Sequence, residues 1–467
     1  MILNDFFDAE TLFRLDGSGL LQQDDSLFWS FRGEQIDLRD TKALLHVMQQ
    51  YYDKADYPVV KFINNIVSNI DLYEKKDRVD HFPAMYQIEH TDICNARCIM
   101  CNHSFTRNHG CKFMDMNIIH ELEPFFPYAS CVVLNGIGEP LLHPQIKELM
   151  ETYDKYGIQL STNTNLSVMD PEIAALMQKT FCDIQISCDA ADPETYESIR
   201  RGLRFDTFKK NARMLRDAGD VEICMATVVM RQNVTQLPQI VELAAELGCA
   251  KVILLDLNAS NLLQNTNDST QFFPATACYY MDRAKETGER LGVIVHTPDY
   301  VYTLDQGSVE QEAEIVGRAP LFQPDTLYED LYRMYESINF FNPVFDALDT
   351  DYCTASRFRS VGYCQFVENR PFISASGDMF NCCTRRMHSM GNILSNGFAA
   401  VWNGTPMQRI RYIFNQGCLP KYCTGCTYLR SGLMVDRIKV TEYDDSFYTD
   451  LYDAYRMNLI DKERRNK

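Results

Sequence analysis

The sequence shows no pattern that predicts export or a membrane anchor. Its first residues, MILNDFFDAETLF, contain no basic stretch followed by an apolar run, so no secretory signal is expected. No stretch stays apolar for the roughly 20 residues that a membrane-spanning helix needs. A low-complexity tract and a repeat of solenoid length are also missing. These absences predict a folded, cytoplasmic protein.

Basic residues are fewer than acidic residues. The chain has 45 lysines and arginines against 64 aspartates and glutamates, a formal net charge of -19. A surface of that sign repels phosphate backbones and anionic lipids, so neither nucleic acid nor a membrane is an expected partner. With 467 residues, of which 46% are hydrophobic, the chain is long enough for two or three domains with cores of ordinary depth.

Cysteine, by contrast, is abundant. Seventeen cysteines in a cytoplasmic protein indicate reduced thiols and metal ligands rather than disulfides. Several of them lie in apolar runs and are expected to be small buried core residues. These are Cys131, Cys182, Cys188, Cys224 and Cys249.

Three other cysteines, Cys94, Cys98 and Cys101, lie in the stretch TDICNARCIMC and are separated by three and then two residues. Thiolates on a loop this short can hold three irons of a cubane 4Fe-4S cluster and leave the fourth iron open. An open iron can bind a small molecule and pass it an electron. The alternative is a zinc knuckle that lacks one ligand, although zinc sites usually combine a C-x2-C with a second pair.

This spacing resembles the cysteine motif of the radical S-adenosylmethionine (radical SAM) enzymes. The resemblance implies that the open iron chelates the amino and carboxylate groups of SAM. It also implies that SAM is reduced to methionine and a 5'-deoxyadenosyl radical, which abstracts hydrogen from a substrate. The family usually has an aromatic residue before the third cysteine, and here Met100, a soft apolar residue, stands in that place.

From Met85 onward, short apolar runs alternate with segments of helical periodicity. Strands are expected at residues 85–91, 131–135, 158–162, 183–188, 221–230 and 251–257. The clearest helix runs from Gln239 to Leu247 and stops at Gly248. Strand and helix in alternation predict an α/β fold, with a parallel sheet and helices on one side. The resemblance implies a partial (β/α)6 TIM-like barrel whose site lies at the carboxyl ends of the strands.

The ends of the second, third and fourth strands carry residues that suit SAM. Residues 135–142, NGIGEPLL, resemble the family's Gly-Gly-Glu-Pro stretch, with Ile137 in place of the first glycine. The resemblance implies that backbone near Gly138 meets the SAM ammonium group and that Glu139 orients the loop. After the next strand, Asn163 is a candidate contact to the ribose or the carboxylate, with an ordinary helix-capping loop as the alternative.

The fourth strand ends in a run that resembles the family's Ser-x-Asp strand and the Ile-Arg that follows it. Carried over by position, Ser187 and Arg200 would bind the SAM carboxylate, because the planar guanidinium matches that group. The family commonly places glycine where Ala190 stands. The fifth and sixth strands are expected to border the adenine, but the sequence singles out no adenine ligand and no catalytic acid or base.

A second set of cysteines follows in the C-terminal third. Cys423 and Cys426 form a C-x2-C that, taken with Cys364 and Cys382, would by itself indicate zinc. However, the spacing Cys364-x12-Gly377-x4-Cys382, followed by MGNI and VW, resembles the SPASM/twitch extension of radical SAM enzymes. That resemblance implies one auxiliary 4Fe-4S cluster on the four cysteines, because no cysteine follows Cys426 to bind another. Further candidates are Cys353, Cys383 and Cys418.

The expected domains follow from these features. They are an α+β N-terminal extension (1–84), a radical SAM core (85–300), a bridging segment (301–360), a SPASM/twitch domain (361–430) and a C-terminal helix (431–467). Apolar spacing predicts two amphipathic helices in the extension, around residues 44–52 and 62–70, and aromatic residues between Leu20 and Leu38 suggest a hairpin. The extension is expected either to pack on the barrel or to dock a substrate.

The resemblance implies an enzyme, a radical SAM oxidoreductase or maturase. Its expected partners are SAM, a peptide or protein substrate that is oxidised, and an electron donor such as flavodoxin or ferredoxin. One alternative is a dehydrogenase or epimerase of a sugar or aminocyclitol, since single-cluster relatives often act on small hydroxylated molecules. Another is a non-enzymatic iron-sulfur or zinc redox-sensing protein, which would need the cysteines but not Gly138, Glu139, Ser187 and Arg200 at strand ends.

Overall fold

A computed structural model of the chain describes residues 18–23, 26–31, 34–38, 40–101, 103, 112–257, 268–298, 301–302, 304, 307–317, 364–383 and 389–416. The chain divides into two compact units. Unit 1 joins Met1–Ala84, Val344–Pro371 and Met379–Lys467, and unit 2 consists of Met85–Pro343 and Phe372–Asp378.

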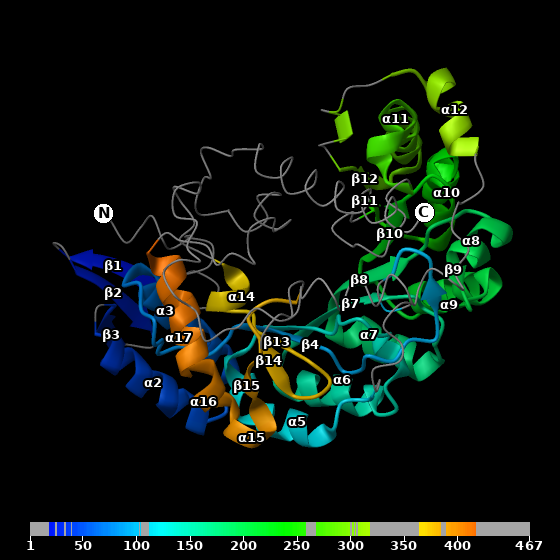
Figure 1. Ribbon diagram of the computed structural model, residues 1–467. Coiled ribbons are helices and arrows are strands. Elements are labelled where there is room, and N and C mark those ends of the chain that lie inside the picture. Colours follow the sequence, from blue (N-terminus) through cyan, green and yellow to red (C-terminus); the bar gives the residue numbers. More distant parts are fainter. Residues whose placement is uncertain are drawn as a thin grey trace, which may run out of the picture. The chain divides into compact units, whose positions relative to one another are not determined.

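Unit 2 is built on a parallel sheet (Figure 1). Hydrogen bonds join its strands in the order β12-β11-β10-β8-β7-β6-β4-β13, and each neighbouring pair is parallel. The strands are β4 (Met85–Ile88), β6 (Cys131–Val133), β7 (Gln159–Thr164), β8 (Phe181–Ser187), β10 (Ile223–Val229), β11 (Lys251–Asp256), β12 (Ile294–His296) and β13 (Phe372–Ile373). The six strands predicted from the sequence are therefore present. The described strands do not close on themselves, which confirms the α/β fold with a partial barrel.

Helices pack along this sheet. Five of them, α6, α7, α9, α10 and α11, contact one another in that order and form one layer (Figure 1). The helices of unit 2 are α5 (Met116–Leu122), α6 (Ile146–Lys155), α7 (Pro171–Thr180), α8 (Pro193–Ile199), α9 (Phe205–Asp217), α10 (Leu237–Leu247), α11 (Pro274–Leu291) and α12 (Val309–Gly317). The predicted stop of α10 is confirmed, because Gly248 adopts φ +79° and ends the helix in the left-handed region.

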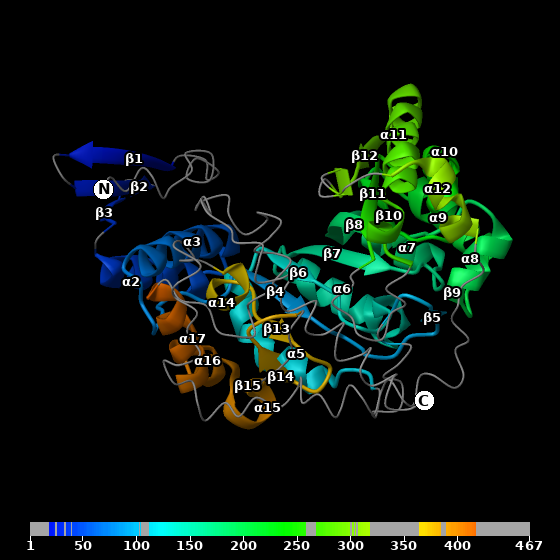
Figure 2. The ribbon, with the colours of Figure 1, turned by 45° about the horizontal axis from the view of Figure 1, so that its top comes forward.

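A short two-stranded ribbon lies outside the main sheet. Its strands are β5 (Arg97–Cys98) and β9 (Arg200–Arg201), which pair antiparallel (Figure 2). The sequence did not predict this pairing. Two residues per strand are too few to produce a periodic pattern, and the partners are more than a hundred positions apart in the chain.

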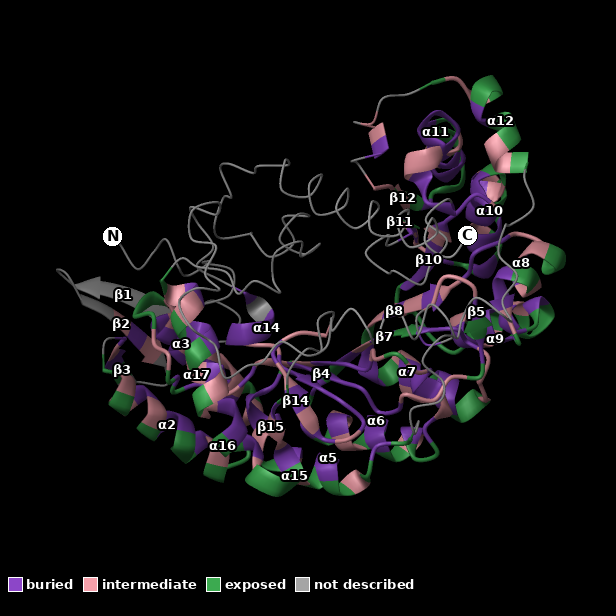
Figure 3. Ribbon diagram, viewed as in Figure 1, coloured by how far each residue is buried: buried purple, intermediate pink, exposed green. Residues whose placement is uncertain are grey.

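The core of unit 2 lies between the sheet and the helices. Apolar side chains of the central strands are fully buried, including Ile184, Ile186 and Met225. Figure 3 shows the strands mostly in the buried class and exposed positions on the outer faces of the helices. Among the described residues, no helix has both the length and the apolarity to cross a bilayer.

Unit 1 contains the N-terminal extension. The two predicted amphipathic helices are confirmed as α2 (Thr41–Asp53) and α3 (Tyr57–Tyr73), which pack against each other. The predicted hairpin is incomplete, since β1 (Ser18–Gln23), β2 (Ser26–Phe31) and β3 (Glu34–Asp37) form a three-stranded antiparallel sheet. The third strand forms because Ile36 pairs with Trp29 of β2 and both side chains are buried.

The C-terminal part of the chain adds short elements. They are α14 (Gln365–Glu368), β14 (Asp378–Phe380), β15 (Ser389–Asn392), α15 (Ile393–Asn396), α16 (Phe398–Trp402) and α17 (Thr405–Asn415).

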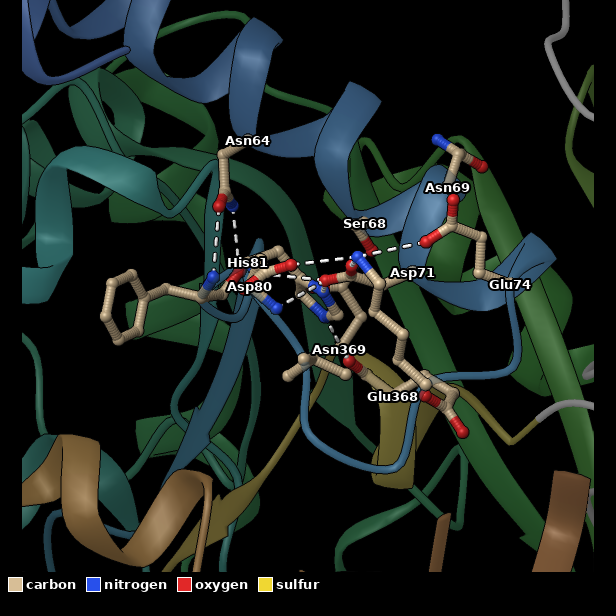
Figure 4. A network of polar contacts seen from close by, with 12 residues as sticks. Asn64, Ser68, Asn69, Asp71, Glu74, Asp80, His81, Glu368 and Asn369 are labelled. Carbon is tan, nitrogen blue, oxygen red and sulfur yellow. Dashed lines mark hydrogen bonds and ion pairs between the residues drawn. The ribbon is translucent and has the colours of Figure 1, made fainter. Parts of the chain in front are cut away.

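A buried polar network in unit 1 joins the N-terminal helices to these elements (Figure 4). Nδ1 of His81 lies 2.8 Å from Oδ2 of Asp71, and Nε2 of His81 lies 2.8 Å from the carbonyl oxygen of Glu368. The indole Nε1 of Trp402 donates to the carbonyl oxygen of His81 at 3.0 Å. The guanidinium of Arg411 lies over the ring of Trp402, 4.2 Å from its centroid. The N-terminal extension therefore shares one core with α14, α16 and α17 of unit 1.

Some features predicted from the sequence lie outside the described residues. They are the helix at 431–467, most of the bridging segment, and Cys353, Cys418, Cys423 and Cys426.

Candidate functional site

The loop that carries Cys94, Cys98 and Cys101 follows β4 at the carboxyl edge of the parallel sheet. The backbone N–H of Cys101 donates to the carbonyl of Cys98 at 3.1 Å, and the N–H of Ala96 donates to Sγ of Cys94 at 3.4 Å. These hydrogen bonds fold the cysteine loop back on itself in short turns.

The β5–β9 ribbon fixes this loop to the segment that directly follows α8. Cys98 stands directly opposite Arg200, and Arg97 stands opposite Arg201. The N–H of Ile99 also donates to the carbonyl of Ile199 at 3.0 Å. Arg200, predicted to bind SAM, is thus brought next to one of the three predicted cluster ligands.

Gly138 packs directly against the cysteine loop. A Cβ atom at this position would lie 2.3 Å from the carbonyl oxygen of Thr91 and 2.6 Å from that of Ile93, closer than real Cβ atoms approach. The N–H of the next residue, Glu139, donates to the carbonyl of Ile93 at 2.8 Å. Only glycine permits this contact between the loop after β6 and the cysteine loop.

The Glu139 carboxylate is buried and joins two strand ends. It accepts hydrogen bonds from the hydroxyl of Thr164 at 2.6 Å, the N–H of Asn165 at 2.7 Å and the N–H of Leu141 at 3.3 Å. Burial raises the pKa of Glu139, and these hydrogen bonds oppose that effect. With its oxygens already satisfied, Glu139 acts here by positioning the loops after β6 and β7.

Asn165 belongs to this site although the sequence analysis did not single it out. Its Nδ2 lies 3.9 Å from Sγ of Cys94 and 3.1 Å from Oδ1 of Asn95. The sequence-predicted contact, Asn163, is two residues earlier on β7, is exposed, and donates its backbone N–H to Oδ1 of Asn135 at 2.6 Å. The only signal for Asn165 was its place in the polar run after the strand.

Arg200 forms a buried ion pair with Asp189. Its Nε lies 2.7 Å from Oδ2 of Asp189, and both side chains are less than a tenth exposed. Burial lowers the pKa of Arg200, but Asp189 and the neighbouring Cys98 thiol raise it more, so the guanidinium stays charged. Asp189 also accepts the N–H of Val228 at 2.7 Å, and the partly buried Ser187 ends β8 two residues earlier. In the sequence, Asp189 stands out only as part of the Ser-x-Asp motif.

An apolar cluster lies beside the cysteine loop. Its buried members Ile199, Met230 and Leu257 come from the ends of α8, β10 and β11, and partly buried neighbours pack against them. Those neighbours are Ile99, Met100 and Val228. Met100 thus packs as an apolar side chain, as expected for the residue that replaces an aromatic one.

The three thiols fit a cluster better than a single metal ion. Burial raises the pKa of Cys98 to about 12. The charge of Arg200 lowers this pKa, and the charges of Cys101, Asp189 and Cys94 raise it further. These groups therefore lie near the Cys98 thiol. Within the described part of the chain, no three His, Cys, Asp or Glu side chains are close enough to hold one ion. Each cysteine of a cubane binds a different iron, so its sulfurs lie farther apart than the ligands of one zinc ion. Arg200 and the Asn165 amide would supply a positive charge and a hydrogen-bond donor to an anionic cluster held by these cysteines.

Two of the four predicted auxiliary ligands are described. Cys364 is buried at the start of α14, and Cys382, next to Cys383, is partly buried after β14. Gly377, between β13 and β14, has φ +81°, which explains why the motif needs glycine there. The other two predicted ligands, Cys423 and Cys426, lie outside the described residues.

Comparisons with known proteins point to one family. Residues 88–244 match the radical SAM superfamily, and residues 364–427 match SPASM, an iron-sulfur cluster-binding domain. Mycofactocin maturase MftC of Mycolicibacterium smegmatis is 31% identical over 185 residues, which are 38% of this chain and 45% of that protein. The tungsten-containing aldehyde ferredoxin oxidoreductase cofactor-modifying protein of Pyrococcus furiosus is 26% identical over 180 residues, covering 36% of this chain and 50% of the relative.

These curated relatives are matched over about half of their own length. Among solved structures, Streptococcus suis SuiB bound to precursor peptide SuiA superposes with a TM-score of 0.50 at 13% identity. That superposition covers 84% of this chain and 89% of SuiB, and it shows a shared fold.

Proposed function

The chain belongs to the radical SAM superfamily and carries a SPASM domain, and from this premise we propose that it is a maturase that oxidises a side chain of a peptide or protein. Its cofactors are SAM, a 4Fe-4S cluster that binds SAM, and an auxiliary cluster. When bound, the first cluster and SAM together supply a one-electron cleavage that yields a radical able to remove hydrogen from substrate.

The observation that carries this proposal is the β5–β9 ribbon, which sets Cys98 opposite Arg200. Cys94, Cys98 and Cys101 hold the first cluster in this proposal, and Arg200 with Ser187 binds the SAM carboxylate. The ion pair with Asp189 fixes the orientation of the guanidinium before SAM arrives.

The remaining residues shape the space around the cofactors. The close approach of Gly138 to the cysteine loop brings backbone to the position proposed for the SAM ammonium group. Asn163 is the proposed contact to the ribose or the carboxylate. The apolar cluster of Ile199, Met230 and Leu257 keeps water away from the cysteine loop, and water exclusion protects reactive intermediates.

A peptide or protein side chain is the proposed substrate. Support comes from mycofactocin maturase MftC, a relative whose name describes a maturase and which is 31% identical to this chain over the matched segment. The auxiliary cluster is proposed to bind to Cys364, Cys382, Cys423 and Cys426 and to accept an electron during the oxidation. The electron for SAM cleavage is proposed to come from a flavodoxin or a ferredoxin.

The first experiment measures iron and SAM cleavage. Anaerobically reconstituted protein should bind about eight irons per chain, as two cubanes require, and should form 5'-deoxyadenosine with dithionite and SAM. Replacing Cys94, Cys98 and Cys101 by alanine should leave about four irons and abolish cleavage. Replacing Cys131 and Cys182, which lie away from the loop, should change neither. A chain that binds zinc, or one that gives no 5'-deoxyadenosine, would contradict the proposal.

A second experiment tests the auxiliary cluster and measures the product formed from a peptide substrate. Changing Cys423 and Cys426 to alanine should preserve SAM cleavage, because those ligands are separate from the first set. Formation of the oxidised product should stop. Full product at the wild-type rate would refute the electron-acceptor role and favour a redox-neutral reaction such as epimerisation.

A further inference from the structure

The β5–β9 ribbon has two chemically different faces. Residues that stand directly opposite each other in an antiparallel pair lie on the same face, and successive residues alternate between faces. Cys98 and Arg200 therefore share one face, and both are buried. Arg97 and Arg201 share the other face, where Arg97 is exposed and Arg201 is partly buried.

The two arginines of the outer face stand directly opposite each other. Side chains directly opposite across an antiparallel pair have Cβ atoms about 4.5–5.5 Å apart, and like charges there destabilise the pairing. In the described part of the chain, neither Arg97 nor Arg201 forms an ion pair or a side-chain hydrogen bond. Nearby Arg204, by contrast, is paired with Glu197. A chain of net charge -19 thus leaves a small cationic surface beside its proposed cluster ligands.

We propose that this face of the ribbon, Arg97 with Arg201, is the docking surface for a small acidic one-electron carrier protein. The proposal rests on the proposed function and names the partner of the same site. One electron leaves the reduced carrier, which becomes oxidised, and enters the cluster held by Cys94, Cys98 and Cys101, with no proton transferred. Because Cys98 lies on the opposite face of the ribbon, a carrier docked here is one strand thickness from a cluster ligand.

Local charge is what such an encounter requires. The overall charge of the chain repels an acidic carrier, but exposed charges farther away than about 8 Å are largely screened at physiological ionic strength. The charges at the contact therefore decide where the carrier binds and how fast it associates. Complexes between electron-transfer proteins are typically weak and small, so two arginines are a substantial part of such an interface.

The test measures binding of an acidic flavodoxin to the reconstituted enzyme by calorimetry at several salt concentrations. Arg97→Glu/Arg201→Glu should weaken binding about tenfold at low salt and flatten its salt dependence. Lys42→Glu/Arg409→Glu is the matched control, because it makes the same change in charge at exposed residues of unit 1. The control should bind flavodoxin like the wild type. Should the reversal variant fail to fold, Arg97→Gln/Arg201→Gln should weaken binding about threefold.

A second measurement uses dithionite, a small reductant that needs no docking site. It therefore tests SAM cleavage independently of carrier binding. All variants should form 5'-deoxyadenosine with dithionite at the wild-type rate, whereas with reduced flavodoxin the reversal variant should be slow. A wild-type chain inactive with dithionite would refute the proposed function, and with it this surface. Normal activity with dithionite, combined with unchanged flavodoxin affinity in the reversal variant, would overturn the docking surface alone. An equal loss of flavodoxin affinity in the control variant would also overturn the docking surface. So would a reversal variant that no longer binds an acidic peptide but still binds flavodoxin with wild-type affinity.

Discussion

Asp71→Asn should selectively destabilise unit 1. The carboxylate of Asp71 is fully buried, and its Oδ2 accepts the N–H of Asp80 at 2.6 Å, the N–H of His81 at 3.1 Å and Nδ1 of His81 at 2.8 Å. Its Oδ1 lies 2.9 Å from Nζ of Lys76. An asparagine keeps one oxygen but removes the charge and turns an NH2 group toward donors. The loss of charge-assisted hydrogen bonds in a buried site should cost about 2–4 kcal/mol.

The assay is urea denaturation followed by tryptophan fluorescence. The chain has two tryptophans, Trp29 and Trp402, and both are buried in unit 1, so their emission reports on that unit. For slopes of about 1–3 kcal/mol per molar urea, the expected loss moves the midpoint by about 1 M or more. Asp80→Asn is the matched control, since Asp80 binds the same Lys76 but is 42% exposed. An exposed pair contributes about 0.5 kcal/mol or less, so its midpoint should barely move.

The pH dependence follows from the same contacts. Burial raises the pKa of Asp71, but hydrogen bonds and charge from His81 and Lys76 oppose it and hold the pKa below its usual value. A depressed pKa stabilises the fold above the unfolded value of about 3.9, and this contribution is lost as the pH falls. The difference between wild type and Asp71→Asn should therefore be full at pH 7 and shrink below about pH 4. Equal midpoints for the Asp71 and Asp80 variants at pH 7 would refute this reasoning.

Three further predictions concern the site in unit 2. Gly138→Ala should lower the iron content to about four per chain, because its Cβ would lie 2.3 Å from a backbone oxygen. The control Gly317→Ala should keep about eight irons, because a Cβ there would meet no atom within 4 Å. Glu139→Gln should weaken SAM binding about tenfold in equilibrium dialysis by loosening two strand ends, and exposed Glu148→Gln should not. Arg200→Lys should weaken SAM binding by about 1.5–3 kcal/mol, since lysine keeps the charge but not the planar fork; unchanged affinity would show that another residue holds the carboxylate.

The main elements were predictable because their information is local. The strands of unit 2 appear in the sequence as apolar runs, and α10 appears as a helical period that a glycine ends. Cys94, Cys98 and Cys101 are close in sequence, so their spacing alone constrains the geometry. Gly138 was predictable from its motif, but the reason for it, contact with the carbonyl of Thr91, required the structure.

The rest depends on contacts between distant residues. The partners His81 and Trp402 are 321 positions apart, and nothing near Asp71 distinguishes a buried aspartate from a solvated one. The ion pair between Asp189 and Arg200 was also not predictable from local sequence, because it depends on where the chain returns after α8. The third strand of the N-terminal sheet was missed for a different reason. Four residues are too short a run to establish an alternation.

The discontinuity of unit 1 has a consequence for synthesis on the ribosome. Helix α3 emerges early, but residues that its neighbour His81 contacts, Glu368 and Trp402, are translated about 290 and 320 positions later. Unit 2 is almost wholly translated in this interval and can fold first, since domains generally fold as units during translation. During this interval the buried polar network of Asp71 and His81 lacks its partners Glu368 and Trp402. A premature stop after residue 343 would leave this network permanently incomplete, because His81 would lack its C-terminal partners, and would expose the nascent protein to aggregation and proteolysis.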